Sequence, residues 1–263
     1  MNTDLAFALE LADLADAISL PKFRATDLHV ETKPDLTPVT EADRAVEETL
    51  RARIAEERPG EAVLGEEFGL DTSSPTPAVR WIIDPIDGTK NYVRGIPIWA
   101  TLIAIERDRE ITAGVASAPA LGRRRWWAAA GEGAFGDGRP IGVSKVATIE
   151  DAQCCYGGLG AWRRSGLLGG LLELTRRSWR SRGFGDFWMH MLVAEGAADV
   201  AAELEVNLWD LAAVKVIVEE AGGRLTDLSG RVTASGGSAL STNGLLHEEA
   251  LGLLRDAGDL RAR

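Results

Sequence analysis

The chain is poor in the residues that soft metal sites and disulfide frameworks require. Its 263 residues include two cysteines, adjacent at Cys154 and Cys155, and three histidines. Cysteines that are neighbours in sequence rarely bridge, so we expect both thiols to be reduced core residues on a strand. The chain has no H-E-x-x-H or C-x-x-C segment. This composition argues against the usual zinc site built from nitrogen and sulfur ligands.

Positive charge and long apolar runs are scarce as well. Lys and Arg number 29 against 40 Asp and Glu, which gives a net charge of −11. A chain so acidic would be repelled by a phosphate backbone, which argues against nucleic acid as the main partner. No apolar run approaches membrane-spanning length, and Asp4 and Glu10 stand where a signal peptide would be basic and then apolar. We therefore expect a cytoplasmic protein with no membrane partner.

The chain does contain ample material for a large core, with 45% hydrophobic and 26% charged residues. The first part of the chain shows helical patterns and then a run of strands, over residues 3–19, 40–58, 62–64, 79–83, 98–106, 111–117 and 125–130. Consecutive strands of this kind suggest antiparallel pairing. After residue 140, strands near 153–157, 178–182 and 198–203 alternate with helices near 163–176, 187–196 and 208–221. We expect a mixed α/β fold with an N-terminal α+β subdomain, 1–139, and a C-terminal α/β subdomain, 140–263.

The segment from Trp81 to Asn91 concentrates the chemistry of the chain. An apolar run ends at Asp84, Pro85 follows, and a second acid stands at Asp87 before a glycine. Since proline lacks an N–H, we expect the strand to stop there and to leave two carboxylates at its carboxyl end. A turn in which both acids accept local hydrogen bonds is the alternative. An unpaired charge at the end of a buried strand is costly, however, and carboxylates alone favour Mg²⁺ or Mn²⁺, so we favour a divalent-metal site.

Three further acids are candidates for the same site, and each also has an ordinary structural interpretation. Glu66 and its neighbour Glu67 follow the strand 62–64 and could form a solvated turn. Asp210 and Asp43 each stand at the third position of a helix whose start is marked by a capping residue, so both could serve as capping acids. In the functional interpretation, one of Glu66 and Glu67 joins Asp84 around a metal ion, and Asp210 supplies a third carboxylate from the C-terminal half.

Three other segments are assigned no function. Residues 131–136 match G-x-G-x-x-G, but Asp137-Gly138-Arg139-Pro140 follows, so no helix opens there to receive a pyrophosphate. A hairpin turn is expected instead. The Arg-Trp run at 123–127 is expected to be a hairpin tip and a strand. The basic cluster from Arg176 to Arg182 could attract a phosphate or lie at a subunit interface, and the sequence leaves both open.

The longest motifs together resemble the inositol monophosphatase family. They follow in the family's order and spacing over essentially the whole chain, at residues 39–43, 65–67, 81–91, 209–213 and 219–223. The resemblance implies a layered α-β-α-β-α sandwich of the inositol monophosphatase and fructose-1,6-bisphosphatase type. It also implies a homodimer that hydrolyses a small phosphate monoester with Mg²⁺.

Site residues follow from the same resemblance. The ligands implied for a first metal are Glu66, Asp84 and the backbone carbonyl of Ile86, and those for a second are Asp84, Asp87 and Asp210. A third, weaker ion near Glu66 would make two or three Mg²⁺ per site, which Mn²⁺ could replace. Thr89 and Asp43 resemble the pair that orients the attacking water, and with Glu66 they are the catalytic candidates. Substrate contacts are implied for Asp87, Gly88, Thr89, Gly185, Asp186, Glu203 and Asp210.

One segment departs from the inositol phosphatases and is similar to the histidinol-phosphate phosphatases of this superfamily. It contains Gly185-Asp186-Phe187, and residues 33–35 and 93–100 share the similarity. Asp186 would take a substrate-facing place, with an N-cap for the next helix as the alternative. Asp186 and Glu203 would then bind the amine and imidazole of L-histidinol phosphate. The alternatives are an inositol-1-phosphate phosphatase of broad specificity and, in another class, a metal-binding regulatory protein without turnover.

Overall fold

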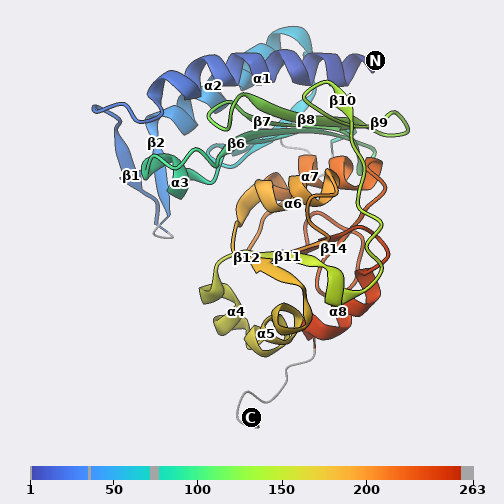
Figure 1. The fold of residues 1–263 in the computed structure, drawn as a ribbon. Helices are drawn as coiled ribbons and strands as arrows, with labels where there is room; N and C mark the ends of the chain where they lie inside the picture. The colour runs from blue at the N-terminus through green and yellow to red at the C-terminus, as the bar shows by residue number, and fades with distance from the viewer. Residues whose placement is uncertain (1, 35–36, 72–76, 256–263) are drawn as a thin grey trace.

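The alternation of side chains along strands decides how the layers of this protein stack. The structure, a computed structural model, describes residues 2–34, 37–71 and 77–255. Within them, two β-sheets alternate with three layers of helices, in the order α-β-α-β-α (Figure 1). The predicted layered sandwich is confirmed. No helix in the part of the chain that the structure describes is long and apolar enough to cross a membrane.

The larger sheet has eight strands in the order β10-β9-β8-β7-β6-β5-β3-β4. They are β3 Ala62–Gly65, β4 Gly69–Leu70, β5 Val79–Asp87, β6 Ala100–Arg107, β7 Glu110–Ala118, β8 Arg124–Ala129, β9 Gly133–Gly136 and β10 Arg139–Pro140. All neighbours pair antiparallel except β3 and β5, which are parallel. The predicted antiparallel meander is therefore confirmed, and the G-x-G-x-x-G segment forms the β8–β9 hairpin as expected.

Helices α1 (Thr3–Lys22) and α2 (Glu41–Glu57) cover one face of this sheet, after the small pair β1 (Val30–Thr32) and β2 (Pro38–Thr40). Trp81 and Ile83 of β5 pack against them, while Ile82 faces the other way. Helix α1 begins at residue 3 as expected, with Asn2 as its N-cap, but it does not end at residue 19 and continues past Pro21 to Lys22. A proline so close to the end removes one hydrogen bond and need not stop the last turn.

Strand β5 does not end at Pro85, contrary to expectation. Pairing with β6 resumes at Asp87 opposite Ala100 after a register shift that begins at Asp84. The bulge leaves Pro85 outside the ladder, so its missing N–H costs no strand hydrogen bond. Its carbonyl instead accepts a hydrogen bond from Thr101 Oγ1 at 2.8 Å. The bulge changes the direction of the chain between Asp84 and Asp87.

The smaller sheet has five strands in the order β12-β11-β13-β15-β14. They are β11 Gln153–Tyr156, β12 Arg180–Arg182, β13 Val200–Leu204, β14 Arg224–Thr226 and β15 Ser238–Thr242. Helices α6 (Asp186–Ala194) and α7 (Leu208–Glu220) lie between the two sheets (Figure 1). Cys154 and Cys155 are free and buried on β11, as predicted.

The outer helical layer consists of α4 (Leu159–Ser165), α5 (Leu168–Arg177) and α8 (His247–Arg255), which pack on the far face of the smaller sheet. One helix was expected over 163–176, but two form, because Gly166 ends α4 with a φ of +77°. The sequence also predicts a final helix over 246–257, of which α8 covers His247–Arg255, and residues 256 and 257 lie outside the described residues. Residue 35 of the 33–35 segment also lies outside them. The expected division at 139/140 stays a prediction, since one apolar cluster joins strands of the larger sheet to α6 and α7.

The helix that carries Asp210 lies unusually close to the larger sheet. At Gly114 of β7, a Cβ atom would lie 2.7 Å from Val216 Cγ1 and 2.8 Å from the Ala213 Cα atom of α7. Only glycine permits this approach of helix backbone to strand.

We therefore expect Gly114→Ala to lower the free energy of unfolding by about 1–3 kcal/mol, the usual result of overpacking a core. Gly252→Ala is the matched control, because Gly252 lies in α8 with no atom within 4 Å of an added Cβ. That change should be neutral or stabilise by up to about 1 kcal/mol through helix propensity. Urea denaturation of both variants measures the difference, and equal midpoints would mean that the close approach is not a constraint.

Candidate metal and substrate site

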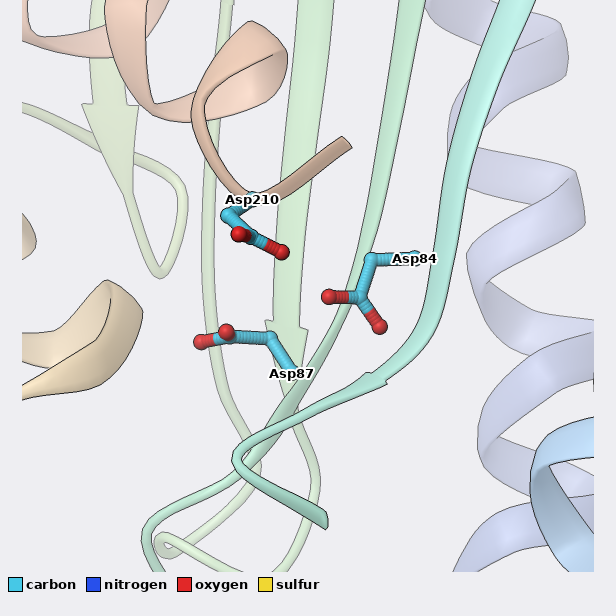
Figure 2. Close-up of side chains that lie close together, drawn as sticks. All are labelled: Asp84, Asp87 and Asp210. Carbon is cyan, nitrogen blue, oxygen red and sulfur yellow. The ribbon is translucent and has the colours of Figure 1, made fainter. Parts of the chain in front are cut away.

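Three aspartates from two distant parts of the chain meet between the sheets. Oxygens of Asp84, Asp87 and Asp210 lie within 4.8 Å of one another. Figure 2 shows Asp84 and Asp87 on the bulged end of β5 and Asp210 at the start of α7. Asp84 is 1% exposed and Asp87 9% exposed. The structure therefore brings together three of the predicted metal ligands.

Capping and site roles are combined in Asp210. One of its oxygens accepts a hydrogen bond from the backbone N–H of Asn207 at 2.7 Å, as expected for an acid at the third helical position. Asp84 accepts in the same way from the N–H of Ile86 at 3.0 Å. These local hydrogen bonds fix the directions of the carboxylates, so the structural interpretation of each acid does not exclude the functional one.

The electrostatics of the three aspartates suit the binding of a cation. Burial raises the pKa of Asp84 well above its ordinary value, and the charges of Glu66, Asp87 and Asp210 raise it further. Burial likewise raises the pKa of Asp87, and that of Asp210 to about 6. Within the described ranges, none of the three forms an ion pair with a basic side chain. Three mutually repelling carboxylates with oxygen donors alone fit a hard divalent cation.

The predicted water-orienting pair is in contact. Thr89 Oγ1 lies 3.3 Å from Asp43 Oδ1 and 3.0 Å from the carbonyl oxygen of Ile86. The other oxygen of Asp43 accepts from the N–H of Thr40 at 2.8 Å and from its hydroxyl at 2.5 Å. Burial raises the pKa of Asp43 to about 6. The hydroxyl of Thr89 is thus held between two acceptors beside the aspartate cluster.

Glu66 lines the same cavity of about 150 Å³ as the aspartates and Thr89, but lies outside their close cluster. Its Oε1 accepts from Lys33 Nζ at 2.8 Å, and Lys33 also donates to Glu67 Oε1 at 2.6 Å. Burial raises the pKa of Glu67 to about 7. No role for the Lys33 side chain was predicted from the sequence. The signal in the sequence was the pair of adjacent acids, Glu66 and Glu67. Because the structure half-buries both, a positive charge has to lie near them.

A second cavity of about 420 Å³ adjoins the first and shares Asp87, Lys90, Asp186 and Asp210 with it. The capping interpretation of Asp186 was wrong. The N-cap of α6 is Gly185, and Asp186 is the first helical residue, with a φ of +52°. Its carboxylate instead accepts from Asn91 Nδ2 at 2.8 Å. Asp186 is therefore an acid of the cavity wall.

Two further residues of the cavity walls, Glu203 and Gly88, were predicted from the sequence. Glu203 reaches the larger cavity from β13, and burial, followed by the charges of Asp186 and Asp210, raises its pKa to about 8. Gly88 sits at the turn between β5 and the short helix α3 (Thr89–Val93) with a φ of +83°. A Cβ there would meet the Ile98 carbonyl oxygen at 3.1 Å.

The basic cluster at 176–182 lies elsewhere and is largely occupied within the chain. Arg176 pairs with Glu173, and Arg177 bridges Glu150 and Glu249. Neither arginine lines the cavities described above.

The fold and these acids define a metal-dependent hydrolase of phosphate monoesters. The family model of the inositol monophosphatase family matches residues 1–259, and the chain belongs to that family.

Two similar proteins and one similar solved structure make the comparison more specific. The chain is 54% identical over 255 residues to a histidinol-phosphatase of Mycobacterium tuberculosis, covering 95% of this chain and 97% of the relative. It is 52% identical over 261 residues to a histidinol-phosphatase of Streptomyces coelicolor, covering 95% and 96%. Among solved structures, the IMPase of Thermotoga maritima is similar with a TM-score of 0.87 at 30% identity, covering 97% of this chain and 98% of that chain.

A test of the metal site follows from the sign of these pKa shifts. The aspartates keep protons in the folded, metal-free protein at pH values where the unfolded chain has released them. Stability of the metal-free protein therefore falls as pH rises from about 4, the unfolded pKa, through the raised folded values. Mg²⁺ replaces the protons and stabilises by mass action. We expect the increase in Tm caused by Mg²⁺ over EDTA to be larger at about pH 8 than at about pH 5.

Thermal unfolding in both conditions measures this increase, with Asp84→Asn as the comparison. The variant should lose most of the Mg²⁺-dependent increase and all turnover, while the metal-free protein becomes more stable at high pH because one repelling charge is gone. A full Mg²⁺ response in Asp84→Asn would remove Asp84 from the ligand set.

Proposed function

We propose that this protein is a phosphatase of histidine biosynthesis that hydrolyses L-histidinol phosphate to L-histidinol and phosphate. One observation carries the proposal: the cavity beside the aspartate cluster is walled by two further buried acids, Asp186 and Glu203. Such a wall suits the cationic alcohol of histidinol phosphate. A neutral polyol carries no positive charge for these acids to bind. The two histidinol-phosphatases at 54% and 52% identity support the same substrate.

The metal-binding half of the site would hold two or three Mg²⁺, with Mn²⁺ able to substitute. Asp84, Asp87 and Asp210 would hold the ions together with Glu66 and the carbonyl of Ile86. When bound, these ions lower the pKa of a water molecule to make a nucleophile near neutral pH and neutralise the phosphate and leaving oxygen.

The chain's own residues would position the reactants. Thr89, held between Asp43 and the Ile86 carbonyl, would orient the attacking water, and Glu66 would share in placing it. Gly88 leaves room at the turn for a phosphate oxygen to approach backbone N–H groups. Lys33, which donates hydrogen bonds to Glu66 and Glu67, would hold these two side chains in place.

The substrate alcohol would lie in the larger cavity, with its ammonium and imidazole within reach of Asp186 and Glu203. Hydrogen bonds between oppositely charged groups are about twice as strong as neutral ones. Both acids have their charged forms disfavoured by burial. A cationic substrate relieves this cost, whereas a neutral sugar alcohol does not. Gly185 lets the chain turn sharply enough to present Asp186.

A second candidate is an inositol-1-phosphate phosphatase of broad specificity. The observation that favours it is the structural similarity to the IMPase of Thermotoga maritima. A metal-binding regulatory protein without turnover is less well supported, because the complete set of Asp84, Asp87, Thr89 and Asp210 converges on one cavity.

We also propose that the protein works in the cytoplasm as a homodimer. The family resemblance supports the dimer, and the proposed place in amino-acid biosynthesis supports the compartment. Light scattering on the purified protein gives the oligomeric state directly, and a monomer mass would contradict the dimer.

The deciding experiment compares phosphate release from L-histidinol phosphate and from inositol-1-phosphate, each with Mg²⁺ and with EDTA. We expect a clear preference for the histidinol ester and no release in EDTA. A preference for the inositol ester would favour the second candidate. No release from either ester, with Mg²⁺ present, would favour the regulatory protein.

The charge of Asp186 can be tested separately. Asp186→Asn keeps the shape and tolerates the positive φ. It should lower kcat/KM for histidinol phosphate about 10- to 150-fold, as expected for a lost hydrogen bond to a charged group worth about 1.5–3 kcal/mol. The change for a phosphate ester without nitrogen should stay within about threefold, since no such bond is lost there.

Asp108→Asn is the matched control, because Asp108 also has a positive φ, of 50°, and lies in the β6–β7 turn. It should leave both substrates unaffected. Equal losses on both esters in Asp186→Asn would give Asp186 a structural role only.

A further inference from the structure

His190 is a buried side chain of the larger cavity for which the site described above gives no role. It belongs to α6, lines that cavity together with Glu203, and is 1% exposed. Its Nδ1 lies 2.8 Å from Ser241 Oγ. Its Nε2 has no hydrogen-bond partner among the described residues. A buried polar atom without a partner is uncommon and carries a cost of about 1–3 kcal/mol.

The position of Nε2 relative to Glu203 indicates what it could bind. The distance from Nε2 to Glu203 Oε2 is 3.9 Å. That is too long for a hydrogen bond between them. A donor group about 2.9 Å from each atom would bridge the two, once the side chains that enclose the buried Nε2 make way for it. Burial lowers the pKa of His190 to about 4, so the ring is neutral. It therefore contributes a hydrogen bond rather than a charge.

Ser241 fixes the ring without fixing which nitrogen carries the proton. It lies on β15, fully buried, opposite Ala201 of the strand that carries Glu203. A hydroxyl can accept from a protonated Nδ1 or donate to a bare one. With Nδ1 protonated, Nε2 is an acceptor, and two acceptors then face the same point of the cavity.

We propose that His190 is a specificity-determining residue whose Nε2, together with Glu203, binds the ammonium group of the substrate. The inference rests on the proposed function. An ammonium carries several N–H donors and can donate to the imidazole and the carboxylate at once. A hydroxyl of a polyol has one proton and can satisfy only one of them. The pair thus selects for an amine at this position of the phosphate ester, and Ser241 is its positioning residue.

Two isosteric variants separate the two ring nitrogens. His190→Asn can keep a group near Nδ1, in reach of Ser241, but has no atom at Nε2. His190→Gln places an amide near Nε2 instead. The substrates are L-histidinol phosphate and its analogue without the amine, 3-(imidazol-4-yl)propyl phosphate.

We expect His190→Asn to raise KM for histidinol phosphate about tenfold or more, with kcat within about threefold and kcat/KM for the amine-free ester unchanged. His190→Gln should recover a large part of the lost affinity. Equal losses on both esters, or an unchanged KM for histidinol phosphate, would overturn the inference. Wild-type protein that hydrolyses neither ester would refute the proposed function as well.

A measurement on the unaltered protein keeps the inference testable if a variant fails to fold. The sequence has only three histidines, His29, His190 and His247, so the ring nitrogens of ¹⁵N-histidine-labelled protein are few enough to resolve. His29 is exposed and His247 lies between two threonines, outside the cavity. L-histidinol should shift the His190 Nε2 resonance, and inorganic phosphate should not. No shift at saturating L-histidinol would overturn the inference.

Discussion

Unbalanced negative charge in a buried place is the constraint on which this structure depends. Oxygens of Asp84, Asp87 and Asp210 lie within 4.8 Å of one another, and burial, followed by the charges of neighbouring acids, raises the pKa of each. Left alone, such a cluster opposes folding. The surrounding layers supply enough apolar burial on both faces of the larger sheet to hold it in place. A divalent cation removes the same repulsion between carboxylates that destabilises the metal-free protein. The affinity for metal and the strain of the metal-free protein therefore have one physical origin.

Two hydrogen bonds tie the proposed metal-binding part of the chain to the proposed substrate-binding part. Asp87 accepts from the N–H of Phe187 at 2.8 Å, and Asn91 donates to Asp186 at 2.8 Å. Both connect the end of β5 and the short helix α3 to the first turn of α6, about a hundred residues further along the chain. In the proposed function, the acid that would face the substrate is thus held by residues next to a proposed metal ligand, so the phosphate and the alcohol would be positioned together. Precise mutual placement of reacting groups is a large part of what enzymes contribute to rate.

The sequence predicted those parts of the molecule that depend on local patterns. The capping arrangement at Thr40 and Asp43, the buried strand over residues 79–83 and the acids around Asp84 were all readable, because neighbouring residues determine them. The errors lie where distant contacts decide. The bulge that carries β5 past Pro85 depends on pairing with β6, and the pairing of Glu66 with Lys33 depends on a loop 33 residues away. The partnerless Nε2 of His190 had no sequence signal at all, since only the packing of α6 against β13 and β15 defines it.

The backbone at Asp186 limits how this site can change over evolution or in the laboratory. A φ of +52° is adopted most easily by glycine, asparagine and aspartate, although Arg24, Arg123 and Glu205 also take positive φ values in this chain. Exchanging this acid for a leucine or a tryptophan would therefore add about 1–2 kcal/mol of backbone strain to its effect on substrate preference. A change that also rebuilds the turn from Gly185 into α6 avoids that strain, so the shape of this turn and the identity of the acid are coupled.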